Sequence, residues 1–171
     1  MYHKEMRTLY LLRHAKSAWD DPSLDDHERP LAARGTRAAT AVAEWVAVHE
    51  VRPDVVLCST AARAQATLEL VLPGLGDPAV LVEPGLYGAS GDQLLTRIAG
   101  LPNGIGEAML IGHEPALSAL LRLVGREGPH RRRLEQKFPT CALAILEGDR
   151  AWSGLGPGSM RIVELVLPRD L

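Results

Sequence analysis

The sequence has few of the features that mark metal sites, disulfide-rich scaffolds, nucleic-acid binding or membrane spans. Its 171 residues include two cysteines, Cys58 and Cys141, which lie singly within apolar runs, so we expect buried free thiols rather than metal ligands or a disulfide. No apolar run approaches the roughly 20 residues that a membrane helix needs. The 19 Lys and Arg against 21 Asp and Glu give a net charge of -2, so nothing global indicates nucleic-acid binding.

The sequence also lacks the core of a signal peptide and any segment that would separate two domains. The apolar run at residues 9–12 is too short for the core of a signal peptide, which together with the free thiols predicts a cytoplasmic protein. No linker, repeat or low-complexity segment divides the chain, and the Gly/Pro-rich residues 154–159 are too few to separate domains. With 46% hydrophobic and 23% charged residues, we expect residues 1–171 to form a single folded domain.

What is present is an alternation of short apolar runs with longer amphipathic ones. This pattern predicts a three-layer α/β/α sandwich with a mostly parallel sheet, and two final strands that pair as an antiparallel hairpin at one edge. The expected strands are residues 8–12, 54–58, 79–83, 108–112, 141–147 and 161–167. The expected helices are residues 31–50, 61–72, 91–99 and 115–124.

Residues suited to phosphate chemistry follow three of these expected strands. The first strand leads into Arg13 and His14, the second into Ser59 with Arg63 soon after, and the fourth into His113. The carboxyl ends of parallel strands meet at one edge of a sheet, so these side chains are expected to converge there. Guanidinium groups match phosphate oxygens, an imidazole can attack phosphorus, and a second imidazole can stabilise the transferring group. The set therefore indicates phosphoryl transfer.

Taken one at a time, these residues have plainer interpretations. Arg13 and His14 could be a solvated strand end, Arg63 an exposed helix arginine and His113 an ordinary loop histidine. The hypothesis depends on their joint placement, because three independent strand ends carry the required groups. Arg63 also falls in the first turn of its expected helix, where free backbone N–H groups favour an anion.

The chain resembles the histidine phosphatase superfamily, which includes the phosphoglycerate mutases. Residues 11–16, Leu-Leu-Arg-His-Ala-Lys, look like its Arg-His-Gly/Ala signature; residues 59–67 resemble its Ser-x-x-x-Arg-x-x-x-Thr motif, and residues 111–115 its Gly-His-x-Pro motif. Residues 26–35, Asp-His-Glu-Arg-Pro-Leu-Ala-Ala-Arg-Gly, and 137–140, Lys-Phe-Pro-Thr, are similar to SixA-type phosphohistidine phosphatases. The resemblance extends from about residue 8 to residue 167 and implies the phosphoglycerate mutase-like fold.

The resemblance also implies roles for individual residues. His14 would be the nucleophile, Arg13 and Arg63 would hold the phosphate, and His113 would stabilise the transferring group. Two serines, Ser17 and Ser59, are weaker candidates for lining the phosphate pocket. No metal ion and no organic cofactor is implied.

One departure from the superfamily bears on the substrate. Phosphomonoesterases and mutases of this type carry a general-acid glutamate where this chain has Gly88. Glu83 is near but out of register, and is otherwise a polar strand end; Asp26 is a substitute acid, a pocket organiser or a cap for the next helix. An alkoxide needs a proton to leave, whereas the conjugate acid of imidazole has a pKa of only about 6.5. The missing glutamate therefore favours phosphohistidine as the substrate.

Three functions stay open at this level. The favoured one is a metal-independent phosphatase that dephosphorylates phosphohistidine in proteins, for which the short chain offers an open cleft. The alternatives are a broad phosphomonoesterase of small phosphorylated molecules, with Asp26 or Glu83 as the acid, and a low-turnover module that binds phosphate or phosphopeptides. Mutase activity is the least favoured, since it needs an acid and a closed site. The basic residues 130–133 could contact an acidic partner, or form a solvated loop or helix face.

Overall fold

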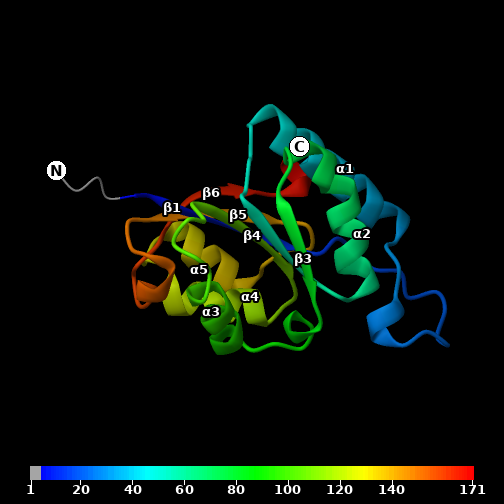
Figure 1. Cartoon of the computed structure of the whole chain (residues 1–171). Coiled ribbons are helices and arrows are strands. Elements are labelled where there is room, and N and C mark those ends of the chain that lie inside the picture. Colours follow the sequence, from blue (N-terminus) through cyan, green and yellow to red (C-terminus); the bar gives the residue numbers. More distant parts are fainter. Residues whose placement is uncertain (1–4) are drawn as a thin grey trace.

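A single six-stranded sheet forms the centre of the computed structural model, which describes residues 5–171 (Figure 1). The strand order is β3-β2-β4-β1-β5-β6. The strands are β1 (Arg7–Arg13), β2 (Val55–Ser59), β3 (Ala79–Glu83), β4 (Glu107–Gly112), β5 (Leu143–Gly148) and β6 (Arg161–Val166). The first four run parallel, and β5 pairs antiparallel with both β1 and β6. The predicted mostly parallel sheet with an antiparallel pair at one edge is thus confirmed.

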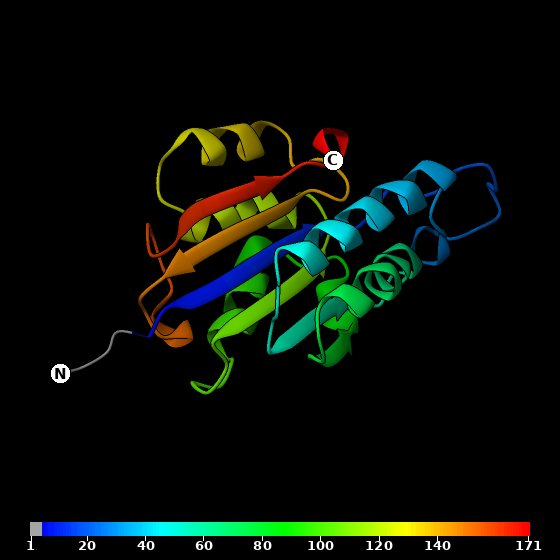
Figure 2. The same ribbon diagram turned by 90° about the horizontal axis from the view of Figure 1, so that it is seen from above.

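Helices cover both faces of this sheet, which gives the three layers expected from the sequence (Figures 1 and 2). One face carries α1 (Ala33–Val48) and α2 (Ala62–Val71). The other carries α3 (Gly91–Ala99), α4 (Ala116–Val124) and α5 (Pro129–Gln136), the last of which packs on α4 and β6. Short 3-10 turns, among them η1 (Asp26–Glu28), η3 (Pro84–Leu86) and η5 (Pro168–Asp170), connect the main elements.

The central strand β1 shows why the apolar runs are continuous rather than alternating. Leu9 and Leu11 point into the core beneath α3 and α4, whereas Tyr10 and Leu12 pack beneath α1 and α2. A strand that is covered on both faces needs apolar side chains at successive positions. Burial on both faces therefore fixes β1 in the middle of the sheet. It also fixes the position of the carboxyl end of β1.

One helix, α5, is not among the helices expected from the sequence. Residues 130–133 lie in α5, so the helix-face alternative describes them. Arg131 pairs with Glu127 and Glu135, both at 2.8 Å, while Leu134 is fully buried. This helix is short and polar, with a single apolar anchor, which is why no amphipathic period is visible in the sequence.

The structure bears on the two cysteines and on the expected absence of a membrane span. Cys58 and Cys141 are buried free thiols, as expected, and burial raises the pKa of each to about 12. Within residues 5–171, no helix combines the length and the apolar character that crossing a membrane requires. The cytoplasmic location stays a prediction.

Candidate active site

The carboxyl ends of three adjacent parallel strands bring the predicted residues together. Arg13 at the end of β1 is in register with Gly112 at the end of β4, and β2 lies on the other side of β4. His14 and His113 directly follow two of these ends, and their rings lie 5.0 Å apart between centroids. Arg63 enters from the first turn of α2. All four line one pocket of about 200 Å³.

The hydrogen bonds of His14 place the lone pair of its ring on Nε2. Its Nδ1 lies 2.7 Å from the carbonyl oxygen of Ala15, which can only accept, so Nδ1 carries the proton. The Nε2 atom accepts a hydrogen bond from Nε of Arg63 at 3.3 Å. The lone pair of Nε2 therefore lies beside the guanidinium that is expected to hold the phosphate.

The surroundings of His14 also keep the ring neutral. The residue is only 7% exposed. Burial, together with the charges of His113, Arg63 and Arg13, lowers the pKa of His14 to about 3, against the raising effect of its backbone hydrogen bond. A neutral imidazole is the form that attacks phosphorus, since protonation would occupy the lone pair.

Arg63 is held in place by Asp26. Its Nη1 donates to the Asp26 carbonyl oxygen at 2.7 Å, and its Nη2 forms an ion pair with the Asp26 carboxylate at 3.0 Å. The same carboxylate oxygen accepts from the Tyr87 hydroxyl at 2.7 Å. Hydrogen bonds from Tyr87 and then Arg63, with the charge of Arg63, lower the pKa of Asp26 despite some desolvation. Asp26 is therefore ionised near neutral pH and suited to orient Arg63.

His113 is positioned by Ser59. The Nε2 of His113 lies 2.7 Å from Ser59 Oγ, and its Nδ1 lies 3.5 Å from Nη2 of Arg63. Because the guanidinium only donates, Nδ1 is the acceptor and Nε2 carries the proton toward Ser59. Burial and the charge of Arg63 lower the pKa of His113 to about 4, partly offset by Asp26.

Arg13 completes the cationic side of the pocket. Its Nη1 donates to the Phe138 carbonyl oxygen at 2.8 Å, and its buried Nε has no hydrogen-bond partner among residues 5–171. Burial lowers the pKa of this guanidinium, while the nearby Glu114 raises it. An arginine stays charged even so, which leaves a buried donor ready for an oxygen anion.

Two residues of the recognised motifs fix the backbone around His14. Thr67, fully buried in α2, accepts from the Ala15 backbone N–H at 2.9 Å and donates to the Arg63 carbonyl oxygen at 2.7 Å. Gly35 in α1 lies against the Lys16 backbone, where a Cβ atom would overlap the Lys16 carbonyl oxygen. That carbonyl accepts from the N–H of residue 32 at 2.8 Å. The first, second and SixA-like motifs are therefore parts of one packed unit.

The weaker candidates for the phosphate pocket lie in different places in the structure. Ser17 lines the pocket, as predicted. Ser59 does not: it is fully buried behind His113, so the expectation that it lines the pocket is corrected. Glu83 lies outside the pocket-lining set and pairs with Arg97 at 2.7 and 3.0 Å, which leaves it as the polar strand end. The helix-cap alternative for Asp26 is also wrong, because α1 begins after an Ala32 cap.

Several pocket residues were not singled out from the sequence. Lys16, Trp19, Glu114 and Thr140 line the pocket, and Tyr87 reaches it through Asp26. The Lys-Phe-Pro-Thr match gave a signal for Thr140, and the position of Glu114 inside Gly-His-x-Pro gave one for that residue. Nothing in the sequence pattern pairs Tyr87 with Asp26, which is 61 positions away.

The pocket residues do not form a metal-ligand set. Across the part of the chain that the structure describes, no group of three or more His, Cys, Asp or Glu side chains is arranged to hold a metal ion. The charge that the pocket offers to an anion comes from Arg13, Arg63 and Lys16.

Comparisons with known proteins agree with this geometry. The profile of the histidine phosphatase superfamily (branch 1) matches residues 9–90. An uncharacterised Mycobacterium tuberculosis protein is 36% identical over 162 residues, which cover 92% of this chain and all of that protein. A SixA protein of Nakamurella multipartitia, described as a candidate phosphohistidine phosphatase, is 31% identical with a TM-score of 0.81, over 95% of this chain and 96% of that one. Its counterpart from Agrobacterium tumefaciens is 30% identical with a TM-score of 0.80, over 95% and 98%. The chain therefore belongs to branch 1 of the histidine phosphatase superfamily.

Proposed function

We propose that this protein removes the phosphoryl group from phosphohistidine in other proteins, through a phosphohistidine intermediate on His14. The observation that carries the proposal is the state of the two carboxylates that line the pocket. Asp26 is held ionised by Arg63 and Tyr87, and both oxygens of Glu114 accept hydrogen bonds from Ser118, at 2.9 and 2.6 Å. Neither carboxylate is set up to protonate a leaving group.

This arrangement suits a leaving group that needs no acid from the enzyme. An alkoxide leaves a phosphate ester only with a proton, because its conjugate acid is very weak. The imidazole of phosphohistidine can take a proton from water on its distal nitrogen, which has a pKa near 6.5 in the free ring. It then leaves as neutral imidazole. The phosphohistidine phosphatase description of the SixA relatives supports the same choice.

In the first step, the Nε2 lone pair of His14 attacks phosphorus. The bond between phosphorus and the substrate nitrogen breaks, and its electron pair goes to the departing imidazole. Arg13 and Arg63 bind the phosphoryl oxygens as charge develops on them. His113 can donate to these oxygens only after its Nδ1 has taken up a proton, which the negative charge of the bound phosphoryl group favours. The pairing of Arg63 with both Asp26 and His14 holds the guanidinium where the attack occurs.

In the second step, water attacks phosphorus of phospho-His14. The bond to Nε2 breaks, orthophosphate leaves, and His14 returns to its neutral form with the lone pair restored. The low pKa of His14 favours this neutral form in the free protein. The proposed sequence draws its positive charge from the arginines, so we expect it to proceed in the presence of EDTA.

The test compares three substrates with EDTA present: a chemically phosphorylated histidine peptide, p-nitrophenyl phosphate and a sugar phosphate. We expect the fastest release of orthophosphate from the first and the slowest from the sugar phosphate, whose alkoxide needs a proton to leave, with p-nitrophenyl phosphate between them because p-nitrophenolate needs none. Faster hydrolysis of either ester would contradict the proposal and favour the phosphomonoesterase alternative. Binding without turnover of any substrate would favour a phosphate-binding module.

A pair of histidine variants tests the intermediate itself. His14→Ala should abolish the acid-labile phosphoenzyme that is trapped by rapid quenching with radiolabelled substrate. The control is His130→Ala, which removes an exposed histidine of α5. A labelled phosphoenzyme in His14→Ala would show that another group is the nucleophile.

A further inference from the structure

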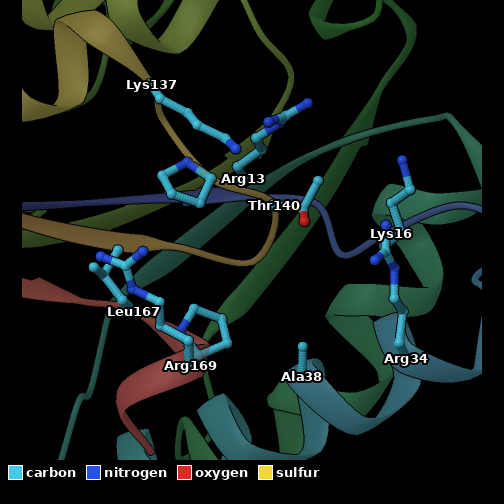
Figure 3. Close-up of a pocket in the computed structure, with 10 residues that line it drawn as sticks. Arg13, Lys16, Arg34, Ala38, Lys137, Thr140, Leu167 and Arg169 are labelled. Atoms are coloured by element: carbon cyan, nitrogen blue, oxygen red, sulfur yellow. The ribbon is translucent and has the colours of Figure 1, made fainter.

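A second and larger hollow opens directly beside the phosphate pocket. It measures about 490 Å³ against about 200 Å³ for the pocket, and the two share Arg13, Lys16 and Thr140. Figure 3 shows basic side chains around it, with Arg13 and Lys137 on one side, Lys16 and Arg34 on another and Arg169 opposite. We call this hollow, defined by those five cationic residues, the basic groove.

The charge of the basic groove is neither typical of the chain nor compensated locally. Five cations line it and no acidic residue does, although the chain as a whole carries a net charge of -2. Within residues 5–171, the side chains of Lys16, Arg34 and Lys137 form no ion pair or hydrogen bond. Arg169 has only an exposed contact of 3.8 Å with its neighbour Asp170. A concave surface of one sign concentrates ligands of the opposite sign.

The sheet topology explains why these cations meet. The antiparallel strand β5 begins at the sheet edge where the parallel strands end, so Lys137, shortly before it, is brought there. β6 runs in the same direction as β1 and ends at this edge, which places Arg169 in the turn that follows. Arg34 lies in the first turn of α1, and Lys16 follows β1. Four separate segments thus supply charge to one hollow.

We propose, resting on the function proposed above, that the basic groove binds acidic side chains that flank the phosphohistidine of a polypeptide substrate. The groove continues from the phosphate pocket, so a segment whose phosphohistidine reaches His14 would pass over it. Its walls also include apolar groups, among them Ala38 and Leu167. Aspartate and glutamate present a charge on a hydrocarbon stem, which matches cations set beside apolar walls. An inorganic polyphosphate has no apolar part that could pack against these walls.

The experiment uses three synthetic phosphohistidine peptides that differ only in the residues beside the phosphohistidine, which are aspartate, alanine or lysine. Each exposed ion pair is worth a factor of roughly two to five in affinity, so two of them give the aspartate peptide about a tenfold higher kcat/KM than the alanine peptide. The lysine peptide should be the poorest substrate. Raising the salt from about 50 mM to about 500 mM should remove most of the preference, because the groove is open to solvent.

Charge reversal locates the preference in the groove. Arg34→Glu combined with Arg169→Glu should bring the ratio of kcat/KM for the aspartate and alanine peptides to one or below. Both residues are exposed, so the fold should be retained, and circular dichroism would check this. The matched control is Arg37→Glu, which reverses another exposed arginine of α1 outside the groove and should keep the ratio.

The outcomes separate the two proposals. Equal hydrolysis of all three peptides would keep the proposed function and overturn the role of the groove, and so would an equal loss of preference in Arg37→Glu. Competition by tripolyphosphate that depends on Arg34, without competition by an unphosphorylated aspartate peptide, would overturn the polypeptide occupant. No hydrolysis of any phosphohistidine peptide by the wild-type protein would overturn both proposals.

Discussion

Replacing Asp26 with asparagine distinguishes a residue that orients Arg63 from one that donates a proton. The carboxylate accepts from Arg63 at 3.0 Å and from Tyr87 at 2.7 Å, and its pKa is lowered. Asparagine keeps the shape and one acceptor oxygen but removes the charge. The Asp26 carbonyl oxygen, which accepts from Arg63 at 2.7 Å, is untouched by the substitution.

The expected loss of kcat/KM in Asp26→Asn can be derived from the solvent exposure of the Arg63 and Asp26 side chains. The Arg63 side chain is 9% exposed, but that of Asp26 is 48% exposed, so solvent screens much of the pair. After that discount the interaction is worth about 1 kcal/mol, which corresponds to a loss of about fivefold in kcat/KM. Removing a general acid would instead cost about 10²- to 10⁴-fold. The two roles differ by more than an order of magnitude.

The assay measures kcat/KM of Asp26→Asn on a phosphohistidine peptide, on p-nitrophenyl phosphate and on an alkyl phosphate. A positioning role predicts the same small factor for all three, because each phosphoryl group uses Arg63 equally. The control is Asp25→Asn, at a neighbouring exposed aspartate outside the pocket. A loss of 100-fold or more that is confined to the alkyl phosphate would refute the reasoning and make Asp26 the acid.

Three further substitutions or measurements test the pocket. The pKa values of His14 and His113, about 3 and about 4, lie below the ordinary 6.5, so the stability that they contribute is present above pH 6.5 and lost as the pH falls through 4 and 3. Histidine NMR should find both rings neutral at about pH 5, and titration of either near 6.5 would contradict this. Thr67→Val leaves the backbone N–H after His14 without its acceptor, which should cost about 1–3 kcal/mol in urea unfolding. Gly35→Ala forces a backbone overlap and should cost about 1–3 kcal/mol, whereas Gly104→Ala, with open space around its Cβ, should cost less.

The convergence of the candidate site residues could be predicted from the sequence because it depends on topology alone. Once three parallel strands were recognised, the residues after them had to share an edge of the sheet, whatever the detailed packing. Arg13, His14, Arg63 and His113 are all placed by this rule. The boundaries of most elements also follow from their apolar periods, to within about two residues.

The pairing of individual polar side chains could not be predicted in the same way. Ser59 faces His113 rather than the pocket, and Glu83 meets Arg97 of α3. Both contacts depend on the direction in which the side chain of the last strand residue points. The alternation of apolar and polar residues along the strand does not predict that direction. The contact of Tyr87 with Asp26 could not be predicted either, because it joins two segments that lie outside the strands and are remote in sequence.

The charges that help to lower the pKa values of the two histidines are also those that the pocket offers to an anion. Burial lowers the pKa of His14 and of His113 most, and the charges of Arg63 and Arg13 lower both further. The same guanidinium groups are those expected to pair with phosphoryl oxygens. The proposed nucleophile, His14, is thus kept neutral by burial together with the charges that would attract its target, and no separate base is required. Removing the charge of Arg63 would raise the pKa of His14 and weaken phosphate binding together. A loss of activity in such a variant therefore measures both effects, and the phosphate affinity has to be determined separately before any part is assigned to the nucleophile.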